Sequence, residues 1–202
     1  MKKKKERSEL EKLLHPEILI HVLPGGSIPE RQTEGAIGYD AHARAIVSPF
    51  NMDPENPLLR ETIFDFKNPP VDKKARKNTI PDEDTGGFAY VLKPGESVLI
   101  GVGFTTAMPF PLFYWVAPRS GLASKHGITV TNAPGTVDPD YRGEAGVLVY
   151  NRTQKPFILK RGMRIAQIVF TWAAIPNFNI LDGYEKLTQT KRGGGGFGST
   201  GI

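Results

Sequence analysis

Short apolar runs separated by turn residues dominate the chain after residue 16. Gly, Pro, Asn and Asp stand between these runs. Short strands with turn signals at regular spacing are typical of an all-β sandwich, jelly roll or barrel. The predicted strands cover residues 17–23, 97–108, 113–118, 127–131, 146–151, 156–160 and 164–173.

Two segments have a pattern that suits a short helix. Residues 6–15 place Leu10, Leu13 and Leu14 on one side of a helix that must end before Pro16. Residues 120–127 have room for one or two helical turns. Helices are therefore a minor part of the predicted fold.

Residues 48–88 break the strand pattern, because they are dense in proline and charge and carry few apolar runs. We interpret them as a long insertion between two early strands, with one further candidate strand at residues 60–66. The predicted organisation is an N-terminal extension over residues 1–16, one β-domain over 17–190 with the insertion at about 48–88, and a glycine-rich flap over 191–202.

Composition excludes several classes of protein. Of 202 residues 39% are hydrophobic, and no run approaches the roughly 18 apolar residues of a membrane span. The absence of cysteine excludes disulfides and thiolate metal sites and suits a reducing compartment, so we expect a cytoplasmic location. The net charge of +5 comes mostly from residues 2–5, which have no interleaved aromatic residues, so no nucleic-acid partner is expected.

The segment "APRSGLASKHG" at 117–127 is the first candidate site. Arg119 offers a forked guanidinium and Ser120 a hydroxyl, and the backbone N–H groups of Ser120 and Gly121 would open a short helix. Together these groups suit an anion. The alternative is an ordinary turn that carries a surface arginine.

The segment "NAPGTVDPDYRGE" at 132–144 is the second candidate. Asp138 and Asp140 would share one face of an extended segment, although Pro139 lies between them. One of these carboxylates could orient a water molecule as a general base. Alternatively, both are turn residues that cap a hairpin.

Weaker signals lie near both ends of the domain. Asp40 follows a glycine turn in "EGAIGYDAHA", and Arg164 and Gln167 open an apolar strand in "RGMRIAQIVF". The ending "RGGGGFGSTGI" lacks the strand and helix of a dinucleotide fingerprint. We interpret it as a mobile flap whose glycines approach an anion while Phe197 stacks on a flat ring; the alternative is a plain flexible tail.

The order and content of five segments together resemble the trimeric dUTPase family. These segments are "AIGYDAHA", "APRSGLA", "GTVDPDYRGE", "RGMRIAQIVF" and "RGGGGFGSTG", and the resemblance covers about 34–47 and 94–201. It implies a jelly-roll-like distorted β-barrel of the dUTPase-like β-clip type, assembled as a homotrimer with active sites at the subunit boundaries. It also implies Mg2+-dependent hydrolysis of dUTP to dUMP and pyrophosphate, with the C-terminal segment closing over the nucleotide.

The resemblance assigns roles to individual residues. Asp138 would polarise the water that attacks the α-phosphorus, Ser120 would lie near the bond that breaks, and Tyr141 would pack under the deoxyribose and leave no room for a 2′-hydroxyl. Asp40 and Gln167 would place the waters of the metal, Gln167 also acting in catalysis. The further substrate-binding residues would be Arg119, Gly121 and Arg164 at the phosphates, Asn132, Gly135, Thr136, Val137 and Gly146 around uracil, and Arg192, Phe197, Gly198 and Ser199 in the flap.

Two other functions compete with this interpretation. A dCTP deaminase of the same fold, or a bifunctional enzyme, relies on a glutamate at the place where this chain has Leu148. A regulatory protein of this fold could bind a partner through residues 48–88, a segment longer than is usual for the family. His126 is expected to be structural, and Trp115 and Trp172 to be core or interface residues.

Overall fold

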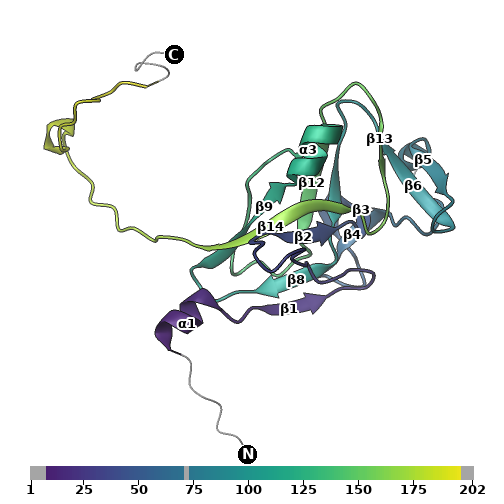
Figure 1. Ribbon diagram of the computed structural model, residues 1–202, viewed down its shortest axis with the longest axis horizontal. Coiled ribbons are helices and arrows are strands. Elements are labelled where there is room, and N and C mark those ends of the chain that lie inside the picture. The colour runs from purple at the N-terminus through teal and green to yellow at the C-terminus, as the bar shows by residue number, and fades with distance from the viewer. Residues whose placement is uncertain (1–7, 71–72, 197–202) are drawn as a thin grey trace, which may run out of the picture.

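The computed structural model describes residues 8–70 and 73–196 (Figure 1). Antiparallel strands dominate it, as the all-β prediction requires, and no helix of this part is long and apolar enough to cross a membrane. The elements are α1 (Glu9–Leu14), β1 (Leu19–Val22), β2 (Tyr39–His42), β3 (Ala45–Met52), β4 (Arg60–Phe64), α2 (Lys73–Arg76), β5 (Thr79–Asp82), β6 (Gly87–Leu92), β7 (Ser97–Gly101), β8 (Phe104–Ala107), β9 (Leu112–Pro118), α3 (Ser120–His126), β10 (Ile128–Val130), β11 (Gly135–Val137), β12 (Gly146–Asn151), β13 (Phe157–Leu159), β14 (Arg164–Trp172) and the 3-10 turn η1 (Tyr184–Lys186).

Two larger sheets carry most of the domain. One has the strand order β10-β12-β7-β3-β4 and the other the order β11-β9-β14-β2. Two smaller sheets, β1-β8 and β13-β6-β5, complete the described part, in which the strands form open sheets and no closed barrel. Alternate residues of β9 and β12, such as Tyr114 and Val149, point into one continuous hydrophobic core.

Most predicted strands are present with small shifts of their ends. The run at 97–108 divides into β7 and β8, because Gly103 adopts a positive φ of 72° and lies against Gly26. A side chain at Gly103 would collide with the Cα of Gly26, so only glycine suits this turn. The sequence pattern missed β2, β3, β5, β6 and β11, which are short or lie beside polar segments.

Residues 48–88 are built onto the core sheets rather than held apart from them. The candidate strand at 60–66 is present as β4, which pairs with β3 at the edge of the five-stranded sheet. The hairpin β5–β6 extends from the body, and β6 pairs with β13 (Figure 1). At the other end of the chain, α1 begins with a capping box between Ser8 and Glu11.

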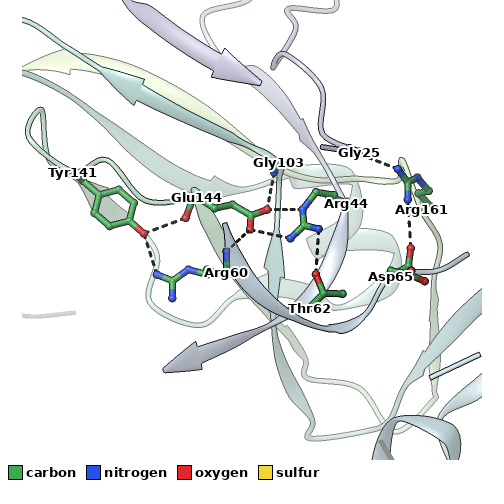
Figure 2. Close-up of polar contacts among 9 residues, drawn as sticks. All are labelled: Gly25, Arg44, Arg60, Thr62, Asp65, Gly103, Tyr141, Glu144 and Arg161. Atoms are coloured by element: carbon green, nitrogen blue, oxygen red, sulfur yellow. Dashed lines mark hydrogen bonds and ion pairs between the residues drawn. The ribbon is translucent and has the colours of Figure 1, made fainter. Parts of the chain in front are cut away.

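A buried ion pair joins the insertion to the core (Figure 2). Glu144 is 0% exposed, and its carboxylate accepts bonds from Nε of Arg44 at 2.7 Å and from Nη2 of Arg44 at 2.9 Å. The backbone N–H groups of Gly103 and Arg60 donate to the same carboxylate at 2.9 and 3.1 Å. Every acceptor position of the carboxylate is thereby used, which offsets the cost of burying its charge.

Glycine at position 101 makes room for this carboxylate, since a Cβ there would collide with Oε1 of Glu144. Arg44 also donates through Nη1 to the hydroxyl of Thr62 on β4 at 3.3 Å. The Arg44–Glu144 pair therefore connects the β2–β3 junction, the β7–β8 turn, β4 and the loop before β12.

Replacing Arg44 with methionine should destabilise the fold strongly, because Glu144 would remain buried without its cation. Loss of one partner of a buried pair costs about 3–5 kcal/mol of unfolding free energy. Chemical denaturation followed by far-UV circular dichroism measures this loss. The exposed Lys93→Met also replaces a cation with methionine, serves as the control and should change the unfolding free energy by less than about 0.5 kcal/mol. A loss below about 1 kcal/mol in Arg44→Met would contradict the anchoring role.

Candidate active site

A basic hollow of about 930 Å³ lies where β9 ends and β14 begins. The strand register explains why sequence positions so far apart meet here. Ala166 of β14 pairs with Pro118 of β9, and Gln167 pairs with Asp40 of β2. Cationic side chains that line the hollow are Arg119, Lys160, Arg161 and Arg164, with His42 and His126 beside them.

Asp40 organises two of these cations. Its carboxylate is 7% exposed, and it accepts bonds from Nε of Arg119 at 2.8 Å and from Nη1 of Arg164 at 3.2 Å. Nη1 of Arg119 donates to the carbonyl of Arg164 at 3.2 Å, and Nη1 of Arg164 also donates to Oε1 of Gln32 at 2.7 Å. The two guanidinium groups are therefore oriented before any ligand arrives, and together with Asp40 they keep a net positive charge.

Gln167 lies half-buried beside this pair. Its Nε2 donates to the carbonyl of Pro118 at 3.1 Å, directly before Arg119. Gly38 gives the amide its space, because a Cβ at that position would collide with Oε1 of Gln167. The amide is thus locked against the strand end that carries Arg119.

Ser120 and Gly121 open α3 at the rim of the hollow. Arg119 is the N-cap residue and makes no side-chain capping bond, so the first N–H groups of the helix have no side-chain partner. A Cβ built at Gly121 meets nothing within 4 Å. Packing within this chain therefore does not require glycine at position 121, and the space in front of the backbone is open to a ligand.

The second group of predicted residues lies on the hairpin that follows β10. Asp138 is exposed, Tyr141 is half-buried, and Asn132 folds toward Gly135, where a Cβ would lie 3.1 Å from its Nδ2. Gly146 pairs with Gly101 at the start of β12. Thr136 and Val137 belong to β11, which pairs with β9.

The structure brings the first group together but separates it from the second within one chain. Val137 pairs with Tyr114, so Asp138 extends beyond the Tyr114 end of β9, whereas Arg119 follows the other end. Five residues of strand between Tyr114 and Arg119 span roughly 16 Å. Asp138 and Tyr141 therefore do not reach the basic hollow of their own chain.

The C-terminal segment after β14 leaves the body of the protein (Figure 1). Arg192 is exposed and its Nε donates to the carbonyl of Gly195 at 2.8 Å. Phe178 and Ile180 are 88% and 91% exposed along the same segment. The predicted flap residues Phe197, Gly198 and Ser199 lie outside the described residues.

Several residues around the site were not found by sequence reasoning. Arg44, Arg60 and Glu144 form the network behind Tyr141, and Lys160 and Arg161 line the basic hollow. Glu144 and Arg161 each lie beside a glycine, and Arg60 and Lys160 lie in charged segments, where a charged residue is typically solvent-exposed. Arg44 lies between two alanines and belongs to no charged segment. The only sequence signal was Glu144, which directly follows the "YRG" of the third segment.

Comparison with known proteins identifies the family of the chain. The dUTPase family model matches residues 88–201, and the chain belongs to this family. Deoxyuridine 5′-triphosphate nucleotidohydrolase of Caulobacter vibrioides is 51% identical over 123 residues, which cover 61% of this chain and 75% of that protein. The same-named protein of Nautilia profundicola is 50% identical over 111 residues, covering 55% and 76%.

Solved structures of phage dUTPases share the fold. The dUTPase of Staphylococcus bacteriophage 80alpha has a TM-score of 0.62 at 18% identity, covering 93% of this chain and 99% of that one. The dUTPase of phage phi11 of S. aureus, whose structure visualises a species-specific insert, has a TM-score of 0.57 at 15% identity, covering 85% and 99%. At these identities the similarity concerns the fold alone.

Lys160 lines the hollow, but its ammonium group forms ion pairs with acidic residues of the insertion. Its Nζ lies 2.7 Å from Asp82 and 2.5 Å from Asp84. The hydrogen bond from Lys160, followed by that from Thr85, holds the pKa of Asp82 below its ordinary value of 3.8, and the hydrogen bonds to Asp82 and Asp84 raise the pKa of Lys160. Lys160 therefore fastens the β5–β6 hairpin and is not a free phosphate ligand.

Lys160→Gln should lower the melting temperature at pH 7, because Asp82 loses its partner. A depressed carboxyl pKa stabilises the fold above the unfolded pKa, and this contribution disappears as pH falls through the folded value. The difference in melting temperature between wild type and variant should therefore begin to shrink near the ordinary Asp pKa of 3.8 and disappear below the lower, folded pKa of Asp82. Thermal scans between pH 7 and pH 3 measure the onset of this decrease, with the exposed Lys125→Gln as control. A difference at pH 3 as large as that at pH 7 would contradict the pairing.

Proposed function

We propose that this protein is a dUTP diphosphatase, which hydrolyses dUTP to dUMP and pyrophosphate by attack of water on the α-phosphorus. In a cell this activity would limit uracil incorporation into DNA and supply dUMP for dTTP synthesis. Family membership supports the activity. The structural observation that carries it is the pair of arginines, Arg119 and Arg164, oriented by one buried carboxylate beside an open helix start.

The substrate fits the charge and shape of this arrangement. A triphosphate bears about four negative charges, which the forked groups of Arg119 and Arg164 can bind in part. Ser120 and the N–H of Gly121, which follow Arg119 at the start of α3, would hold the phosphate chain. Gln167 keeps the backbone at Pro118 in place and so fixes the position of Arg119.

The hairpin supplies the remaining chemistry. Asp138 is exposed and would accept a proton from the attacking water. The backbone around Asn132, Gly135, Thr136, Val137 and Gly146 would read the uracil edge. A slot that hydrogen-bonds one ring edge rejects other bases, since its polar groups would otherwise go unpaired.

A complete site needs more than one copy of the chain. Because Asp138 lies roughly 16 Å of strand or more from Arg119 in its own chain, the hairpin of one protomer would serve the hollow of a neighbour. A homotrimer with sites at its subunit boundaries satisfies this requirement. Arg192 and the residues Phe197, Gly198 and Ser199 would complete the site from an extended C-terminal segment, with Phe197 stacking on the base.

The residues also fit magnesium in the role that nucleotide enzymes give it. Mg2+ is usually held by one or two carboxylates, several waters and the substrate phosphates. Among the described residues no cluster of three acidic or histidine side chains forms a protein cage; Glu30 lines the hollow, and the carboxylate of Asp40 lies against Arg119 and Arg164. Asp40, with Gln167, would orient the waters of an ion carried by the phosphates, and such an ion would neutralise charge that develops on them. The dUTPase of phage phi11 coordinates a structural Mg(II) ion.

Other expectations from the sequence remain predictions. Leu148 lies on β12 opposite Leu99, and no acidic side chain replaces it, which supports dUTP hydrolysis over dCTP deamination. A protein partner for residues 48–88 and a cytoplasmic location are proposals that come from the sequence. A groove of about 850 Å³ between the insertion and the five-stranded sheet is where a partner of the insertion would bind.

The proposed activity is tested by measuring pyrophosphate release from dUTP, dCTP, dTTP and UTP with Mg2+, and ammonia release from dCTP in parallel. We expect rapid release from dUTP alone and no ammonia. Asp138→Asn should bind dUTP normally but turn over about 10²–10⁴-fold more slowly, as loss of a general base predicts. Asp140→Asn is the matched control on the same turn. Turnover of Asp138→Asn within threefold of wild type would contradict its role.

The shared site predicts complementation between inactive variants. Arg119→Ala and Asp138→Asn should each be nearly inactive alone, because each removes a different half of every site. Unfolding and refolding the two variants together should form mixed trimers in which some sites combine two intact halves. Pyrophosphate release should then rise to a measurable fraction of the wild-type rate. Recovery no greater than in separately refolded samples would show that both residues act within one chain.

A further inference from the structure

The inserted strand β4 contacts a residue of the proposed site directly (Figure 2). Nη2 of Arg60 donates a hydrogen bond to the hydroxyl oxygen of Tyr141 at 3.1 Å. The same hydroxyl donates to the carbonyl of Glu144 at 3.1 Å. The phenol oxygen of Tyr141 is therefore held from two sides, by its own loop and by the insertion.

Arg60 is itself fixed in place by its backbone and by a second side-chain bond. Its N–H donates to Oε2 of Glu144 at 3.1 Å, and its Nη1 donates to the carbonyl of Pro49 at 3.2 Å. The N–H of Glu144 in turn donates to the carbonyl of Leu58 at 2.7 Å. The segment 58–60 and the Tyr141 loop are thus joined by bonds in both directions and anchored on the buried Arg44–Glu144 pair.

The Nε atom of Arg60 indicates what determines the conformation of this side chain. Its Nε is buried and has no hydrogen-bond partner among the described residues. A buried donor without a partner is costly, so another interaction must maintain this conformation. The bonds of the two terminal nitrogens to Pro49 and Tyr141 provide that interaction.

Without Arg60, the phenol of Tyr141 would lose one of its two hydrogen bonds. The ring is half-buried, and Gly143 makes room for its hydroxyl, since a Cβ there would collide with that oxygen. No side chain at position 143 therefore presses on the hydroxyl. The bond to the carbonyl of Glu144 would be the remaining one of the two hydrogen bonds on the phenol.

We propose that Arg60 is a positioning residue that holds the ring of Tyr141 rigid and thereby makes the enzyme discriminate deoxyribo- from ribonucleotides. This inference rests on the proposed function, in which Tyr141 packs under the sugar. A ring excludes a 2′-hydroxyl only if it does not yield to the extra atom. The insertion therefore contributes to substrate selection through Arg60, without contacting substrate.

The test measures kcat/KM for dUTP and for UTP in wild type, Arg60→Met and Arg60→Lys. Methionine keeps the backbone N–H bond to Glu144 but removes the bond to Tyr141. A charge-assisted hydrogen bond is worth about tenfold or more, so the dUTP/UTP ratio of kcat/KM should fall about tenfold in Arg60→Met. Arg60→Lys, which retains a donor, should recover part of the ratio. Arg76→Met, on α2 of the same insertion, is the matched control and should keep the wild-type ratio.

Tyr141→Phe removes the same bond from the other side and serves if Arg60→Met folds poorly. The double variant Arg60→Met/Tyr141→Phe should have the same ratio as Tyr141→Phe alone, because both changes break one contact. A ratio in folded Arg60→Met within twofold of wild type, or fully additive effects in the double variant, would overturn the inference and leave the proposed function intact. Failure of the wild-type protein to cleave dUTP would overturn both.

Discussion

The carboxylate of Glu144 is the constraint on which this structure depends. A fully buried charge is tolerated only when each of its acceptor positions has a donor. Here Arg44 provides two donors, and the backbone at Gly103 and Arg60 provides the others. These donors come from three separate parts of the chain, so satisfying one side chain fixes how the early strands, the insertion and the hairpin loop lie relative to one another.

The two halves of the proposed site are held in place by different interactions. Around Asp40 the geometry follows from strand register, because β2, β14 and β9 are neighbours and their ends coincide. Around Tyr141 it follows from side-chain bonds between the loop and β4. Each arrangement joins the family match over residues 88–201 to an earlier strand, which is β2 with Asp40 in the first and β4 with Arg60 in the second.

Local pattern and motif coincide at Asp40, Arg119 and Gln167, which the structure brings close together. These three could be predicted as site candidates because each lies at a fixed place in a short motif at a strand end, and their roles remain proposals. The Arg44–Glu144 pair could not be predicted, since its members are 100 residues apart and no local pattern links them. The bond from Arg60 to Tyr141 could not be predicted either, because residues 48–88 have too few apolar positions to reveal how β4 pairs.

The double role of Arg60 has a consequence for how the chain can be shortened. Its N–H satisfies the innermost carboxylate of the molecule, while its side chain reaches the loop that precedes β12. Excision of residues 48–88 would keep the Arg44 cation but remove the Arg60 N–H, so that one oxygen of the buried Glu144 carboxylate would lose a donor. A shortened chain would therefore fold well only if a new backbone or side-chain donor, or a bound water molecule, replaced that N–H.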